Sequence, residues 1–254
     1  MTIRMKLLDL TGKKILITGA AVGIGKETAI LVNKLGAEVI LIDIDENGLK
    51  EVIASLEGNG NQFYSYDLND LDGIESEIDK ILFGFGPLDG FVHCVGIRSR
   101  RPLSMMSPKL LSEIMCLNFG SFVELVRCVT KKNNFNKGLS IVGISSVSSL
   151  RGSAGVTAYA SSKAAMDCAV RCLAKELASK KIRLNTVVPA QVNTPAYKDL
   201  IKLKGDAKDD ILFRQYLGLG EPADVANIIA FLLCKGSGLI TGSAIPADGG
   251  FLST

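Results

Sequence analysis

Short runs of consecutive apolar residues alternate along this chain with longer stretches in which apolar residues recur every three or four positions. The short runs predict buried β-strands, and the longer stretches predict amphipathic helices. The strands expected from this pattern cover residues 13–18, 38–43, 62–66, 88–95, 139–144, 183–188 and 244–247. The helices expected between them cover residues 26–36, 46–57, 71–83, 110–132, 159–179 and 223–233.

This alternation of strands and helices predicts an α/β fold. We expect a Rossmann-type, doubly wound parallel sheet of about seven strands with helices on both faces, because parallel strands need crossover connections that cover the sheet. No Pro-rich or Ser-rich linker divides the chain, so residues 1–254 are expected to form a single domain.

The composition narrows the class of protein. Hydrophobic residues make up 47% of the chain and charged residues 22%, which is enough apolar surface for a core covered on both sides. The longest apolar runs, such as 228–233, are far too short to span a membrane, and no signal peptide is recognisable, so we expect a cytoplasmic protein. A net charge of +3 gives no reason to expect a nucleic-acid partner.

Six cysteines are scattered through the chain without a Cys-x-x-Cys pair, and His93 is the single histidine. A zinc site needs more ligands at closer spacing than this. We therefore expect buried free thiols and no metal site.

The first predicted strand runs into a glycine-rich turn, Thr18-Gly19-Ala-Ala-Val-Gly23-Ile-Gly25, which is followed by a helix. Glycines in such a turn let the backbone approach a pyrophosphate, which the free N–H groups of the helix N-terminus can bind. Asp43 ends the next strand about 20 residues later, where a carboxylate binds the adenosine ribose hydroxyls. Such an acid repels a 2′-phosphate and favours NAD over NADP. The alternative is that Asp43 caps the following helix.

Tyr159 and Lys163 are separated by four positions on a predicted helix, so they share a face. A tyrosine that exchanges protons near neutral pH needs its pKa lowered by about 3, or roughly 4 kcal/mol, and a cation about 4 Å away supplies an effect of that size. The spacing alone is also compatible with a solvated lysine beside a packed tyrosine. Ser146, at the end of a strand, and Asn118, within a helix, are further polar residues in the same half of the chain.

These motifs, in this order and spacing, resemble the short-chain dehydrogenase/reductase family over nearly the whole chain. The resemblance rests on the glycine turn, Asp67-Leu68, Asn118, Ser146, Tyr159-x-x-x-Lys163, residues 189–194, Ile240-Thr-Gly and Asp248-Gly-Gly. It implies an oxidoreductase that interconverts a secondary alcohol and a ketone with NAD(P).

The resemblance also implies roles for individual residues. Tyr159 would be the acid or base, Lys163 would lower its pKa and hold the nicotinamide ribose, and Ser146, rather than Ser145, would bind the substrate oxygen. Asn118 would link Lys163 to a water relay. The cofactor-binding residues expected from the resemblance, with NAD favoured, are Gly19, Gly23, Ile24, Gly25, Asp43, Asp67, Leu68, Cys94, Gly96, Tyr159, Lys163, Pro189, Val192 and Thr194.

The chain departs from the family pattern at two places. His93-Cys94-Val95-Gly96 replaces an asparagine-containing motif at the end of the fourth strand, and Ala190 replaces a glycine. We expect His93 to be a hydrogen-bonded structural residue rather than a catalytic one. We expect the loop through Val192 and Thr194 still to hold the nicotinamide carboxamide.

The substrate remains open. Three arginines, Arg98, Arg100 and Arg101, follow the fourth strand, and the segment at about 195–220, which is the family's substrate lid, carries Lys198, Lys202, Lys204, Lys208 and Arg214. These charges are either a solvated surface or a site for an anionic sugar, polyol or acyl derivative. An NADPH-dependent 3-oxoacyl-carrier-protein reductase and a non-catalytic dinucleotide-sensing module are the alternatives. The family resemblance implies a homotetramer or homodimer, and the short apolar runs lead us to expect no membrane partner.

Overall fold

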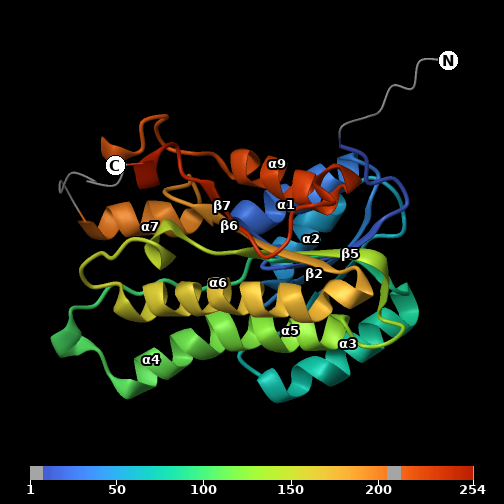
Figure 1. The fold of residues 1–254 in the computed structure, drawn as a ribbon, viewed down its shortest axis with the longest axis horizontal. Helices are drawn as coiled ribbons and strands as arrows, with labels where there is room; N and C mark the ends of the chain where they lie inside the picture. Colours follow the sequence, from blue (N-terminus) through green and yellow to red (C-terminus); the bar gives the residue numbers. More distant parts are fainter. Residues whose placement is uncertain (1–7, 205–212, 254) are drawn as a thin grey trace.

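A computed structural model describes residues 8–204 and 213–253, and its centre is a parallel β-sheet (Figure 1). The strands are β1 (Lys14–Thr18), β2 (Glu38–Asp43), β3 (Gln62–Ser65), β4 (Leu88–His93), β5 (Phe135–Ile144), β6 (Arg183–Pro189) and β7 (Ala244–Ala247). They lie in the order β3-β2-β1-β4-β5-β6-β7, and every neighbouring pair is parallel. The seven-stranded parallel sheet expected from the sequence is therefore confirmed.

Helices cover both faces of this sheet (Figure 1). One layer contains α1 (Gly23–Lys34), α2 (Glu46–Ala54) and α9 (Pro222–Leu233). The other contains α3 (Leu71–Phe85), α4 (Pro108–Met115), α5 (Ser121–Val129) and α6 (Thr157–Leu177), while α7 (Pro195–Lys204) lies at one end. The short helical turns are η1 (Leu103–Met105), η2 (Cys116–Gly120), η3 (Val147–Ser149), η4 (Ala178–Lys180), η5 (Lys235–Ser237) and η6 (Phe251–Ser253).

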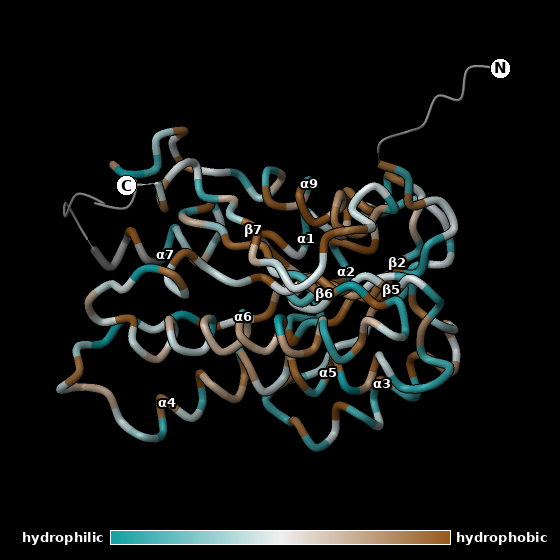
Figure 2. The backbone as a smooth tube through the Cα atoms, in the orientation of Figure 1, coloured by the Kyte–Doolittle hydropathy of each residue, from teal (hydrophilic) through white to brown (hydrophobic). Residues whose placement is uncertain are grey.

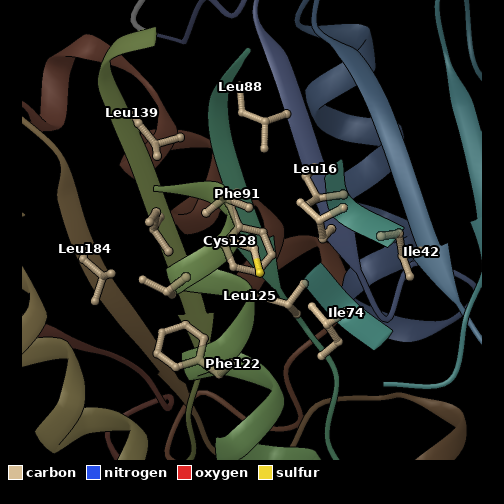
Figure 3. Packing of buried hydrophobic residues seen from close by; sticks show 14 of the residues in the cluster. Leu16, Ile42, Ile74, Leu88, Phe91, Phe122, Leu125, Cys128, Leu139 and Leu184 are labelled. Carbon is tan, nitrogen blue, oxygen red and sulfur yellow. The ribbon is translucent and has the colours of Figure 1, made fainter. Parts of the chain in front are cut away.

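Alternate strand residues enter two separate apolar cores. Leu16 of β1 packs with Phe91 of β4 in the core beneath α3, α5 and α6, and Figure 3 shows both in one cluster with Phe122 of α5. Ile15 and Ile17 point the other way, into the core beneath α1 and α9. Apolar colouring accordingly follows the central strands in Figure 2. Because side chains on a strand alternate between faces, continuous apolar runs are what a sheet buried on both sides requires.

Several elements differ from the expected boundaries, since β4 ends at His93, α2 ends at Ala54 and the unexpected helix α7 covers Pro195–Lys204. The end of the glycine turn, from Gly23 to Gly25, is the start of α1, and β5 begins at Phe135 rather than near residue 139. The single helix expected over 110–132 is instead α4, the π-helical turn η2 and α5. A π turn adds one residue to the helical repeat and rotates the side chains that follow it. It also contains Asn118.

The six cysteines are free, as expected, but only Cys128 and Cys234 are buried, and Cys94 and Cys116 are half-buried. Cys168 and Cys172 of α6 are exposed rather than buried.

In the described part of the chain, no helix has both the length and the apolar character needed to cross a membrane.

Candidate active site

A cavity of about 410 Å³ opens at the carboxyl ends of the strands. It lies beside β1 and β4, the point in the sheet where the strand order reverses. Ligands of open parallel sheets bind at such reversals, because the loops that follow the two strands diverge there. The predicted site residues that line this cavity are Gly19, Gly23, Ile24, Gly25, Asp43, Cys94, Gly96, Ser146, Tyr159, Lys163, Pro189, Val192 and Thr194.

The glycine turn is shaped by close backbone contacts. Gly19 has φ +70°, and a Cβ atom there would lie 2.9 Å from the carbonyl carbon of Cys94. A Cβ atom at Gly25 would lie only 1.9 Å from the carbonyl oxygen of Gly19. The turn therefore folds back against both its own strand and β4, which no larger residue at these two positions allows.

Asp43 is fixed at the end of β2 by two backbone groups. Its Oδ2 accepts a hydrogen bond from Ala21 N at 3.0 Å, and its Oδ1 accepts one from Asp45 N at 3.1 Å. The carboxylate is thereby tied to the glycine turn and lines the cavity. The helix-capping alternative for Asp43 is wrong, because Asp45 is the N-cap of α2 and accepts from Gly48 N.

Tyr159 lies on the first turn of α6 and lines the cavity together with Ser146. Burial raises the pKa of the Tyr159 phenol, while a hydrogen bond with Ser146 and the positive charge of Arg98 act in the opposite direction. The Arg98 guanidinium carbon lies 5.8 Å from the centre of the Tyr159 ring. Ser146 Oγ also accepts a hydrogen bond from Ser148 N at 3.2 Å, which leaves the Ser146 hydroxyl proton available to a partner in the cavity.

Lys163 is almost completely buried, with an exposed fraction of 3%. Its Nζ donates to the carbonyl oxygen of Ile144 at 2.8 Å, and burial lowers its pKa to about 8. A Cβ atom at Gly96 would lie 3.0 Å from this Nζ. The glycine after β4 thus makes room for the lysine, because a larger residue would press against its ammonium group.

Asn118 lies behind the cavity wall rather than in it. Its Oδ1 accepts from Ile97 N at 2.8 Å, and its Nδ2 donates to Ile97 O at 2.9 Å and to Ser162 Oγ at 3.0 Å. These bonds join the π-helical turn to the segment after β4 and to α6. The water relay through Asn118 stays a prediction.

Two predicted cofactor residues are outside the cavity wall. Asp67 accepts hydrogen bonds from the backbone and side chain of Asn69, and Leu68 is buried in the core beneath α3. Their contact with a cofactor stays a prediction.

The predicted structural role of His93 agrees with its contacts. The ring is fully buried, and Nδ1 shares a hydrogen bond of 2.9 Å with Thr18 Oγ1 on the neighbouring strand. Burial, together with the positive charge of Lys163, lowers the pKa of His93 to about 3, so the ring is neutral at physiological pH. Ala190, the other departure, lines the cavity and packs against the small apolar cluster of Val188 and Phe251.

The three arginines after β4 are exposed, and they lie in the segment that begins with the cavity-lining residues 94–98. Arg98 is part of the wall itself, and Arg101 N donates to the carbonyl oxygen of Gly155 at 2.7 Å. We call residues 96–107 and 145–158 the rim, because both segments begin with residues that line the cavity. The rim contains four arginines and no Asp or Glu.

The expected lid segment includes α7, on which Lys198 is exposed. Arg214 lies beyond it, in a short described segment that leads to α9. Lys208 and the side chains of Lys202 and Lys204 lie outside the described residues.

Several residues that support the site were not found from the sequence. Asp167 of α6 accepts hydrogen bonds from Ser145 and Thr186. Gln215 pairs with the backbone of Gln191, donating to its carbonyl at 3.1 Å and accepting from its N–H at 3.0 Å. A period of four on α6 from Tyr159 through Lys163 to Asp167 could have indicated the first of these, whereas the Gln191–Gln215 pair left no local signal.

The cavity fits a dinucleotide. No side chain caps the N-terminus of α1 at Val22, so the first helical N–H groups are left for an anionic ligand, and Gly23, Ile24 and Gly25 line the cavity there. By contrast, residues 8–204 and 213–253 contain no group of three or more His, Cys, Asp or Glu side chains placed to hold a metal ion.

Comparisons with known proteins agree with this geometry. A family model described as enoyl-(acyl carrier protein) reductase matches residues 19–252. A 3-oxoacyl-[acyl-carrier-protein] reductase of Thermotoga maritima is 35% identical over 96% of this chain and 100% of its own length. An L-xylulose reductase of Mus musculus is 31% identical over 97% of this chain and 99% of its own length.

A solved structure shares the whole architecture. It is a short-chain dehydrogenase/reductase of Brucella melitensis, described as glucose/ribitol dehydrogenase, with a TM-score of 0.89 and 29% identity over 96% of this chain and 98% of the other. The family model and these full-length relatives show that the chain belongs to the short-chain dehydrogenase/reductase family, as an oxidoreductase that interconverts alcohols and carbonyl compounds with NAD(P).

Proposed function

We propose that Tyr159 is the proton donor and acceptor of this oxidoreductase, with Ser146 binding the reacting oxygen and Lys163 assisting. The observation that carries this proposal is the convergence of all three side chains on the cavity that also holds the glycine turn and Asp43. A bound nicotinamide would supply or accept the hydride. The oxygen that gains charge as hydride arrives needs a proton donor and a hydrogen-bond donor that are already in place.

The proton chemistry follows from the surroundings of Tyr159. Its raised pKa keeps the phenol protonated near neutral pH, which suits reduction of a ketone. In the oxidative direction the phenolate is needed, and the Ser146 hydroxyl and the Arg98 guanidinium both stabilise it. Arg98 therefore belongs to the proposed proton-transfer site, although it follows a different strand.

We propose that NAD is the preferred cofactor. Asp43 lines the cavity with its carboxylate held in place by the Ala21 and Asp45 N–H groups, so it cannot turn away from a 2′-phosphate without breaking these bonds. The neighbouring Ile44 also lines the cavity and brings no positive charge. A like-charge contact of this kind disfavours NADP.

For the substrate we propose a ketone or secondary alcohol with an anionic group. Arg98 lines the cavity, and Arg100 and Arg101 are exposed beside it on a rim whose two segments contain no carboxylate. A guanidinium pairs well with carboxylate or phosphate oxygens. The names of the relatives support two kinds of carbonyl substrate, a 3-oxoacyl group and a ketose. Reduction of a 3-oxoacyl carrier protein is thus the second candidate function, favoured by the 35% identical relative.

We also propose that copies of the chain associate through α4, α5 and α6. Ala160, Ala164 and Ala169 of α6 are partly exposed and small enough to let a second helix approach closely. Light scattering of the purified protein should give the mass of a dimer or tetramer. A monomer at micromolar concentration would contradict this proposal.

The catalytic assignment is tested by Tyr159→Phe with a panel of ketones, each offered with and without a carboxylate or phosphate. We expect kcat to fall by about 10²- to 10⁴-fold, because the lost hydroxyl is the proton donor. The dissociation constant for NADH, measured by fluorescence, should change little. Undiminished kcat in this variant would remove Tyr159 from the mechanism, and NADH binding without turnover of any compound by the wild type would favour a sensor.

A further inference from the structure

A buried carboxylate lies one helical turn beyond Lys163. Asp167 of α6 has an exposed fraction of 4%, and both of its oxygens are used. Oδ2 accepts from Ser145 Oγ at 2.8 Å, and Oδ1 accepts from Thr186 Oγ1 at 2.7 Å. Burying a carboxylate between two hydroxyl groups is unfavourable unless something else compensates for the lost hydration.

The hydrogen bonds of Asp167 join the elements that hold the proposed catalytic residues. Ser145 lies between the end of β5 at Ile144 and Ser146, and Thr186 belongs to β6. Asp167 itself shares α6 with Tyr159 and Lys163. The Ser145 hydroxyl donates to Asp167, and the next residue, Ser146, lines the cavity. The carboxylate therefore holds the backbone at Ser145 and Ser146 against α6. It thereby sets the position of the Ser146 hydroxyl relative to α6.

The charge of Asp167 has a nearby counterpart. Burial is the main influence on the pKa of Lys163 and lowers it, whereas the charges of Cys94 and Asp167 would raise this pKa and favour the charged form. Cys94 cannot supply a negative charge near neutral pH, because burial raises its pKa to about 12. In the described part of the chain, Asp167 is then the anion that acts on the Lys163 ammonium.

The other groups that face Lys163 carry no compensating charge at neutral pH. From β4, His93 is neutral, since its pKa is about 3. From α6 itself, the phenol of Tyr159 is protonated, since burial raises its pKa. Two uncharged polar side chains lie close by. The Ser145 hydroxyl lies 3.5 Å from the carbonyl oxygen of Lys163, and Asn118 Oδ1 lies with Lys163 Nζ beside the position that a Cβ atom of Gly96 would take.

We propose that Asp167 is a positioning residue that keeps Lys163 protonated and holds the Ser146 turn against α6. It touches neither substrate nor cofactor in this arrangement, since it is absent from the cavity wall formed by the described residues. The proposal deepens the function proposed above, because it gives a reason why a buried lysine can stay charged in this site. It rests on the role proposed there for Lys163.

The test compares Asp167→Asn with Thr186→Val. The first variant removes the charge and keeps a side chain of the same shape that can still hydrogen-bond, whereas the second removes one hydrogen bond and keeps the charge. In protein labelled with ¹³C at lysine Cε, the Lys163 signal is assigned with Lys163→Arg and followed as pH rises. This titration needs no turnover, so it succeeds or fails independently of the proposed reaction.

We expect Lys163 in Asp167→Asn to lose its proton at least about one pH unit below the wild type, because an opposite charge nearby favours the charged form. Thr186→Val should titrate like the wild type. With a substrate that is turned over, the fall of kcat at high pH should begin at a lower pH in Asp167→Asn than in the wild type, and at the wild-type pH in Thr186→Val. Identical titrations of wild type and Asp167→Asn, or an equal shift in Thr186→Val, would overturn the proposal. If Asp167→Asn fails to fold, Asp167→Glu must retain the wild-type titration or the proposal is wrong.

Discussion

The two sides of the cavity are built in different ways. On the side of β1 and α1 the wall is mostly backbone, shaped by Gly19 and Gly25, and Asp43 is the one acid among the described residues that line it. On the side of the loops after β4 and β5 the rim is made of exposed side chains, including Arg98, Arg100 and Arg101. A wall of backbone fixes the shape of a ligand closely, whereas an exposed basic rim fixes only its charge. This is why the sequence predicts the cofactor class but leaves the substrate open.

The largest effect is expected from adding a methyl group to the backbone wall. In Gly25→Ala the new Cβ would lie 1.9 Å from Gly19 O, and neither atom is on a side chain that can move away. Overpacking of this kind costs about 1–3 kcal/mol, so we expect NADH binding to weaken by up to about 100-fold. Isothermal titration calorimetry measures this directly.

Gly84→Ala is the matched control for that variant. Gly84 is also helical, in α3, but no atom lies within 4 Å of the position its Cβ would take. An alanine there should leave NADH binding unchanged and stabilise the protein by about 0.5–1 kcal/mol, because glycine is the poorer helix former. Equal loss of NADH affinity in both variants would show that the glycine turn has no special role.

A smaller effect is expected from removing the charge of the rim. Substituting Arg98, Arg100 and Arg101 with Ala should raise KM for an anionic substrate by roughly tenfold, and added salt should shrink the difference. The control replaces Lys132 and Lys137, two exposed residues near the amino end of β5, with Ala. An unchanged KM for the best substrate in the arginine variant would show that these three arginines are a solvated surface and do not bind the substrate.

The smallest expected effect is on the pH dependence of folding stability, and it comes from the buried His93 of β4. The pKa of His93 falls from an ordinary 6.5 to about 3 in the folded protein. The unfolded state therefore binds an extra proton between these pH values, and stability falls as pH drops below about 6.5. From pH 6.5 to 5.5 this amounts to about 1 kcal/mol.

The measurement for His93 is urea unfolding of wild type and His93→Asn at both pH values. Asparagine does not titrate, so the variant should lack this part of the pH dependence whatever its overall stability. The same pH dependence in both proteins would mean that His93 is hydrated or charged in the native state.

The sequence predicted most of the fold because the fold depends on pattern. The seven apolar runs correspond to the seven strands, and Ser146 lines the cavity because the carboxyl ends of parallel strands lie at the same edge of the sheet. Tyr159 and Lys163 line the same cavity from α6, where their spacing of four places them on one helix face. The π-helical turn around Asn118 was missed, because the apolar period of 110–132 is continuous and one inserted residue leaves no mark on it.

Residues that act through distant partners were also missed. The bonds of Asp167 to Ser145 and Thr186 cross 22 and 19 positions of the chain, so the period of four on α6 can point to Asp167 but not to its two partners. From the sequence, Asp43 was a possible N-cap of the next helix, whereas the N-cap of α2 is Asp45. Closely spaced polar residues do not show at which of them the helix begins. Side-chain direction, rather than residue type, decides such cases.

Calorimetric titration of the wild-type protein with NADH and with NADPH tests the central claim most directly. That claim is that a backbone wall with one fixed carboxylate, Asp43, selects the cofactor. The account predicts that NADH binds at least about tenfold more tightly than NADPH, because the 2′-phosphate would be placed against a like charge. Equal affinities, or tighter binding of NADPH, would contradict it.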